Sequence, residues 1–180
     1  MDKAKKAGVV DVHLLNGMLQ VHCSAGSLNT ALDVYDQFEE YQFKPTVYSN
    51  RLVIQMFLKQ RRLERCLAFK KRVEDGGQKL DVLSYGSIIS HYSKHEQLGS
   101  ALMMIKECIA VTGSPPGESY LKDFRVLCRL EGVEDTLKVE DMIGKDPIEW
   151  LRHGEAVLKR EYSKKGNRGI NFVHNAMVRG

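Results

Sequence analysis

The sequence repeats with a period of 35 residues, and this period restricts the possible fold more than any other feature. Five columns of apolar or small residues recur at this step. The columns are Leu28, Leu63, Leu98 and Val133; Leu19, Ile54, Ile89 and Phe124; Leu32, Leu67, Leu102 and Leu137; Ala31, Cys66, Ala101 and Thr136; and Phe38, Val73, Cys108 and Ile143. Agreement across these columns indicates a repeat protein, in which each unit packs against its neighbours.

Each unit is predicted to contain two helices. In the first unit, apolar residues recur at three- and four-residue offsets over residues 15–23 and again over 28–38, and residues 24–26 separate the two stretches. Leu15, Met18 and Leu19 belong to the first apolar face. Because one helical hairpin cannot bury its apolar face alone, neighbouring hairpins must stack. The predicted fold is therefore all-α, a right-handed α-solenoid of helix-turn-helix hairpins with a helix that caps its C-terminal end.

The period also divides the chain into segments. Residues 148–180 do not repeat; Pro147 fits the first turn of a helix whose apolar stripe includes Trp150 and Leu151. The predicted segments are an N-terminal segment 1–11, repeats 12–46, 47–81 and 82–116, a degenerate repeat 117–147, a capping helix 148–165, and a basic tail or the start of a further repeat at 166–180.

Charge and cysteine usage exclude several classes of protein. The formal net charge of +4 lies entirely in residues 148–180, and residues 47–81 form a basic island with nine basic and four acidic side chains. No apolar run reaches the roughly 18 residues that span a bilayer, which excludes a membrane protein. The cysteines form no CxxC pair, so we expect buried free thiols at Cys23, Cys66, Cys108 and Cys128.

Residues 14–46 carry a family resemblance. They contain an asparagine at Asn16, the apolar pair Met18 and Leu19, an Ala-Gly pair at residues 25–26, Ala31, and Lys-Pro at residues 44–45. This pattern resembles a pentatricopeptide repeat of the P class, as found in organellar proteins of the plant type. Tetratricopeptide repeats have a period of 34 and Trp, Gly and Tyr landmarks that are missing here.

The resemblance implies single-stranded RNA binding, with one base facing each repeat. The fifth and last residues of a repeat read the base, which gives the pairs Asn16 with Thr46, Arg51 with Asp81, and Gly86 with Pro116. The second residue clasps the base ring, which assigns this role to His13, Tyr48 and Leu83.

These pairs are unequal as base readers. Asn16 is a typical reader, and with Thr46 it leans toward a pyrimidine. Arg51 is long for an edge contact and can pair with Asp81 instead. Gly86 and Pro116 offer no side-chain donor or acceptor. Lys59, near the end of a first helix, is a candidate for contact with RNA phosphates.

Together these features predict a non-catalytic, single-stranded RNA-binding adaptor in organellar splicing, processing, stability or translation. The alternative is a protein scaffold in an organellar ribonucleoprotein or transcription complex, with RNA contact secondary. The chain can also be a fragment of a longer array, or bind RNA by charge and shape alone. No catalytic or metal-binding motif is present, so no cofactor, small-molecule substrate or membrane is expected. The resemblance implies a chloroplast or mitochondrial location.

Overall fold

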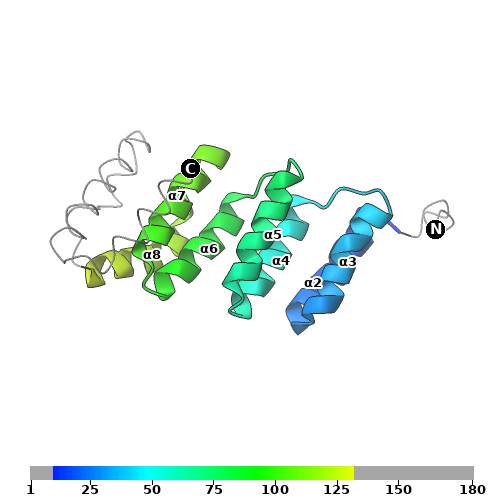
Figure 1. The fold of residues 1–180 in the computed structure, drawn as a ribbon, viewed down its shortest axis with the longest axis horizontal. Helices are drawn as coiled ribbons and strands as arrows, with labels where there is room; N and C mark the ends of the chain where they lie inside the picture. The colour runs from blue at the N-terminus through cyan, green and yellow to red at the C-terminus, as the bar shows by residue number, and fades with distance from the viewer. Residues whose placement is uncertain (1–9, 132–180) are drawn as a thin grey trace. The chain divides into compact units, whose positions relative to one another are not determined.

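The computed structural model describes residues 10–131, and the described part consists of helices joined by short turns (Figure 1). The helices are α2 (Val12–Ala25), α3 (Leu28–Glu40), α4 (Val47–Lys59), α5 (Leu63–Asp75), α6 (Val82–Lys94), α7 (Leu98–Thr112) and α8 (Glu118–Leu130). The prediction of an all-α helical-repeat solenoid is confirmed. The predicted capping helix 148–165 and the tail 166–180 lie outside the described residues. No helix within residues 10–131 is both long and apolar enough to cross a bilayer.

The backbone repeats as the sequence does. Helices α2, α4 and α6 begin 35 residues apart, as do α3, α5 and α7. Positive φ angles mark the turn inside each hairpin, at Gly26, Arg61 and Glu96. Helix α8 breaks the period, because it begins at Glu118 and not at residue 117.

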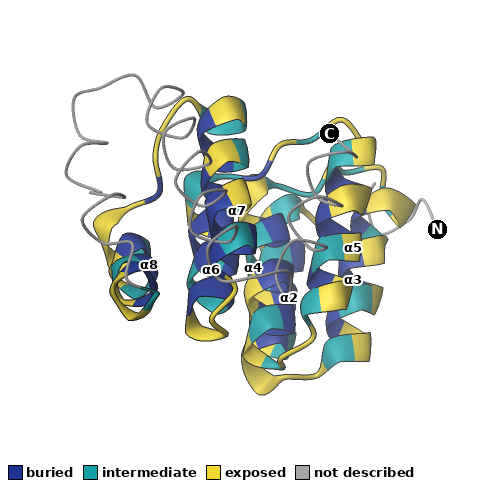
Figure 2. Ribbon diagram, turned by 60° about the vertical axis from the view of Figure 1, so that its left-hand side comes forward, coloured by how far each residue is buried: buried dark blue, intermediate teal, exposed yellow. Residues whose placement is uncertain are grey.

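The chain divides into two compact units, residues 1–87 and 88–180, and the division falls inside α6. The first unit holds hairpin 1 (α2 and α3) and hairpin 2 (α4 and α5). Helix α4 contacts both helices of hairpin 1. Figures 1 and 2 show α2 and α4 in one layer of this unit, and α3 and α5 in the other. In the second unit, α7 packs against α8.

Buried side chains follow the sequence columns (Figure 2). Leu19, Ile54, Ile89 and Phe124 are each 0% exposed, and Cys66 is buried like the alanines in its column. The predicted free, buried state of all four cysteines is confirmed. The prediction for Met18 is wrong, because this side chain is 36% exposed and lies outside the buried face of α2.

Burial raises the pKa of the Cys66 thiol from 9.0 to about 12. The unfolded chain loses the thiol proton at a lower pH than the folded chain. The free energy of unfolding should therefore fall as the pH rises from about 9 to about 12. Below pH 9 this thiol should have no effect on it. We expect a slope of up to about 1.4 kcal/mol per pH unit from this group. Urea unfolding at pH values across this window measures it. Cys66→Ala is the control, because its column neighbours Ala31 and Ala101 are alanines in equally buried sites. An equal slope in the control would contradict the assignment.

Candidate nucleic-acid interface

Asn16 and Thr46 lie together beside the start of α4. Asn16 Nδ2 donates to Thr46 Oγ1 at 3.4 Å, and Asn16 Oδ1 accepts a 2.6 Å hydrogen bond from Ser49 Oγ. Thr46 is the N-cap of α4, where its hydroxyl accepts from the Ser49 backbone N–H and its own N–H donates to Ser49 Oγ. The capping motif of hairpin 2 thus fixes the orientation of the Asn16 amide, with its oxygen engaged and its second N–H left to donate.

Arg51 and Asp81 also lie together. Arg51 Nη1 is 3.6 Å from Asp81 Oδ2, and both side chains are about a quarter exposed, at 23% and 25%. The guanidinium carbon lies 5.4 Å from the centre of the Tyr48 ring. Asp81 Oδ1 accepts hydrogen bonds from the Ser84 N–H and hydroxyl at the start of α6. Arg51 is therefore held between an aromatic face and a carboxylate, as a donor group that solvent can reach.

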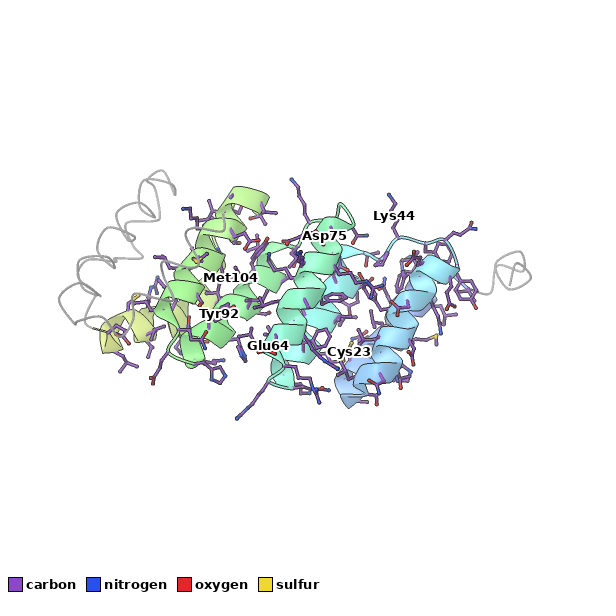
Figure 3. All side chains as sticks on the ribbon, in the orientation of Figure 1. Cys23, Lys44, Glu64, Asp75, Tyr92 and Met104 are labelled. Carbon is purple, nitrogen blue, oxygen red and sulfur yellow. The ribbon has the colours of Figure 1, made fainter. Side chains whose placement is uncertain are left out.

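The other predicted residues lie apart from these two pairs. His13 is exposed in the first turn of α2, and Lys59 is exposed at the last residue of α4. Lys59 is eight residues beyond Arg51, roughly 12 Å along the helix axis. In Figure 3, Lys44 and Asp75 mark the end of the first unit near Thr46 and Asp81, whereas Cys23 and Glu64 mark the opposite end, where Lys59 lies. Lys59 therefore cannot contact the same atoms as the reader pairs.

The third predicted pair needs a correction. Thr46 and Asp81 each stand directly before a first helix, but the residue in that place before α8 is Gly117, not Pro116. The period lengthens by one residue because α7 runs to Thr112, two residues further than the matching helices, and Gly113 takes the positive φ. Gly117 has no side chain to offer a base.

The basic island is partly structural. Lys70 is buried at 8% exposure, bonds Glu74 at 2.8 Å and lies 5.7 Å from the Tyr85 ring centre. Arg72 bonds Asp36 at 2.7 Å, and this hydrogen bond raises the pKa of the guanidinium. Lys70 therefore does not belong to a solvated face, although it is one of the nine basic residues of the island. Six cations of the island are exposed and have no ion pair among the described residues: Lys59, Arg61, Arg62, Arg65, Lys71 and Lys79.

Sequence reasoning missed the serines that hold both pairs. Ser49 and Ser84 each stand three residues after a last-position residue, in the motifs Thr-x-x-Ser and Asp-x-x-Ser, 35 residues apart. The three-residue spacing, which is that of a helix capping box, is the sequence signal that predicts the role of these serines. A second missed column is Lys59, Lys94 and Arg129, each in the last turn of a first helix. It supplies one cation in each repeat after the first, which has Ser24 at this position.

Repeated hairpins with polar pairs at constant positions define a helical-repeat protein. The family model for the PPR repeat matches residues 14–43 and 83–110, which contain most of hairpin 1 and most of α6 and α7. These two segments of the chain therefore match pentatricopeptide repeats. No curated protein sequence matches it.

Two solved structures resemble the chain in fold. One is the PPR domain of Arabidopsis thaliana protein-only RNase P 1 in complex with tRNA, at 17% identity and a TM-score of 0.57, covering 84% of this chain and 86% of that one. The other is the pentatricopeptide repeat protein PPR10 from maize, at 16% identity and a TM-score of 0.46, covering 86% of this chain and 27% of that one. The first of these supports the assignment of the fold.

Proposed function

We propose that this protein is a non-catalytic adaptor that binds single-stranded RNA through its first helices, in chloroplast or mitochondrial RNA metabolism. The matched family and the tRNA complex of the similar PPR domain support the class of ligand. The observation that carries the proposal is the recurrence, at a 35-residue step, of a donor side chain held against the N-cap of the next first helix. Asn16 with Thr46 and Arg51 with Asp81 are these two sites.

The chemistry of both sites favours bases with carbonyl oxygens. Asn16 has a second amide N–H that can donate to a base carbonyl, and its oxygen keeps one lone pair beside the hydrogen bond from Ser49. Arg51 has donors only. Uracil O4 or O2 suits both sites, and one such contact discriminates by about 1–3 kcal/mol at most. Tyr48, three residues before Arg51 on the same helix and 37% exposed, supplies an aromatic face beside the second site. We therefore propose a modest preference for uracil-rich strands, with affinity that depends mainly on charge.

Arg51→Ala is expected to weaken binding of uracil-rich single-stranded RNA about 3- to 10-fold, the cost of one charge-assisted hydrogen bond in a partly exposed site. Lys59→Ala is expected to flatten the dependence of log Kd on log salt concentration by about 0.7, because it removes one phosphate contact. Fluorescence anisotropy with labelled RNA at two or more salt concentrations measures both effects.

Lys71→Ala is the matched control. Lys71 is exposed on the second helix of the same hairpin, and replacing it removes one positive charge, as Lys59→Ala does. It should leave the affinity within about twofold, a small change for a distant exposed charge. Absence of RNA binding by the unaltered protein at low salt would contradict the proposed function. Equal losses for Lys59→Ala and Lys71→Ala would show that only net charge matters.

A scaffold role is the second candidate, and a specific observation favours it. Helix α2 exposes three large apolar side chains, Leu14, Met18 and Val21, and exposed apolar patches are common on protein-binding surfaces. In this role the protein would mainly bind a protein partner in a ribonucleoprotein complex, and its contact with RNA would be secondary. Retention of a partner by variants that no longer bind RNA would support this role.

A further inference from the structure

Ser49 holds the side chain of Asn16 from the neighbouring hairpin. Its hydroxyl lies 2.6 Å from Asn16 Oδ1, across 33 residues of sequence. Ser49 is 0% exposed and belongs to the capping box at the start of α4, so its position is fixed by the helix. Asn16 is half-buried on α2. A fixed hydroxyl beside a half-buried amide can decide which end of the amide points toward α4.

The lengths of two contacts identify the end of the amide that faces Ser49. Hydrogen bonds between two oxygens are roughly 2.5–3.0 Å long, whereas N–H···O bonds are roughly 2.7–3.2 Å long. The 2.6 Å contact with Ser49 therefore fits the amide oxygen. The 3.4 Å contact with Thr46 Oγ1 is too long for a hydroxyl that donates to an amide oxygen, so it fits the amide nitrogen. With the amide turned over, both contacts would have unfavourable lengths.

Thr46 leaves the hydroxyl proton of Ser49 available for Asn16. Thr46 Oγ1 has a proton of its own and lies 2.9 Å from Ser49 Oγ, so Ser49 can accept from Thr46 while it donates to Asn16. In the next repeat, Ser84 Oγ donates to the Asp81 carboxylate at 2.6 Å, because a carboxylate has no proton to offer. Ser84 therefore holds the last residue of the preceding repeat, whereas Ser49 also holds the fifth.

The orientation of an asparagine amide discriminates between the two pyrimidines. An amide can form two hydrogen bonds with the Watson–Crick edge of a base, one from its N–H and one to its oxygen. Uracil has the O4 acceptor where cytosine has the N4 donor, and N3 is a donor in uracil and an acceptor in cytosine. For a base held in one position, the amide must be turned over to change from uracil to cytosine. A fixed amide therefore favours one base, and a freely turning amide accepts both.

We propose that Ser49 determines specificity at the first site, where it holds the Asn16 amide in the orientation that favours uracil over cytosine. The proposal rests on the proposed RNA-binding function and adds the group that sets the choice of base. Ser49 is a positioning residue, because it acts through Asn16. Its hydrogen bond draws the amide oxygen toward α4. The second amide N–H is then left for the uracil O4, and the remaining lone pair of the oxygen is left for the uracil N3–H.

The ratio of the affinities for oligouridine and oligocytidine of equal length tests the proposal. The unaltered protein is expected to bind oligouridine about 3- to 10-fold more tightly, the effect of one net hydrogen bond. In Ser49→Ala the ratio is expected to fall below about twofold, because the amide loses the bond that orients it. Arg51 contributes little to the ratio, since cytosine also offers acceptors to its donors. Fluorescence anisotropy with labelled strands measures the ratio.

Ser84→Ala is the matched control, because it removes the same hydroxyl from the same capping position one repeat later and leaves the Asn16 contacts in place. It should keep the ratio of the unaltered protein. Thermal unfolding by circular dichroism compares the stability of the two variants. A ratio that Ser49→Ala leaves unchanged, or that both variants lower equally, would overturn the proposal.

Two further variants keep the test independent of folding and of the proposed function. Ser49→Cys keeps nearly the same shape with a weaker donor, so its ratio should also fall. In an Asn16→Ala background, adding Ser49→Ala should not change the ratio further, because Ser49 acts through Asn16; a further change would overturn the proposal. Equal binding of both strands by the unaltered protein would overturn this proposal and leave RNA binding intact, whereas binding of neither strand would contradict the proposed function.

Discussion

Phe38→Ala is expected to lower the free energy of unfolding of the first unit by about 3–5 kcal/mol, the usual cost of removing a fully buried phenylalanine. Phe38 is 0% exposed near the end of α3, and its ring centre lies 6.1 Å from that of Tyr35. The equivalent residues, Val73 and Cys108, are smaller, so hairpin 1 is built around a larger side chain at this position. Alanine would leave a cavity that the neighbouring helices cannot close without moving.

Urea unfolding followed by circular dichroism measures this loss. Phe38→Leu is the control, because it keeps most of the buried volume and should cost clearly less. Since repeat proteins can unfold in parts, the transition should be monitored in both units, and the loss should appear in the first. A cost below about 1 kcal/mol for Phe38→Ala would contradict the described packing, because it would match an exposed site.

Asn50→Ala is expected to cost about 2–4 kcal/mol, because it leaves a buried hydroxyl and a half-buried amide without their partner. Asn50 is 1% exposed. Its Oδ1 accepts from the Tyr35 hydroxyl at 2.5 Å, and its Nδ2 donates to Gln78 Oε1 at 2.8 Å. Gln78 in turn donates to the Pro45 carbonyl, next to Thr46. This chain of hydrogen bonds links hairpin 1 to the end of hairpin 2 behind both reader pairs.

A double-mutant cycle with Tyr35→Phe separates the contributions. Tyr35→Phe removes the hydroxyl that Asn50→Ala would leave unsatisfied, so the double variant should be more stable than the sum of the single losses predicts, by about 1 kcal/mol or more. Chemical denaturation of the four proteins under one set of conditions gives this coupling. Additive losses would mean that the Tyr35–Asn50 hydrogen bond contributes nothing to stability. The affinity for RNA should also fall in Asn50→Ala, if the link positions Thr46.

The hairpin architecture could be predicted from the sequence because it depends on buried side chains at a constant period. Leu19, Ile54 and Ile89 are buried, and each stands at the same position of the first helix of its own repeat. Apolar spacing reports this directly. The Arg51–Asp81 pairing could also be anticipated, since the two residues have opposite charge and the repeat frame places them at the reader positions.

Other features depended on information that spacing does not carry. Met18 is apolar at a helical offset, but whether it is buried depends on what lies beside α2. Lys70 is charged, but the carboxylate of Glu74 and the ring of Tyr85 allow its burial. The position of the α8 N-cap depends on a two-residue extension of α7. The apolar columns do not reveal this extension. The hydroxyl of Ser49 acts through a hydrogen bond across 33 residues, which becomes visible only in three dimensions.

The turn between α4 and α5 makes the stability of hairpin 2 depend on hairpin 1. Arg61 has a φ of 57°, a conformation that costs roughly 1–2 kcal/mol for a residue with a side chain, whereas hairpin 1 has Gly26 at the same position. Gln60, next to Arg61, donates a 2.7 Å hydrogen bond to the Gly26 carbonyl. The hydrogen bond to hairpin 1 offsets part of the cost of this turn. Hairpin 2 without hairpin 1 would keep the unfavourable φ and lose the hydrogen bond, so the stability of the second hairpin depends on the first.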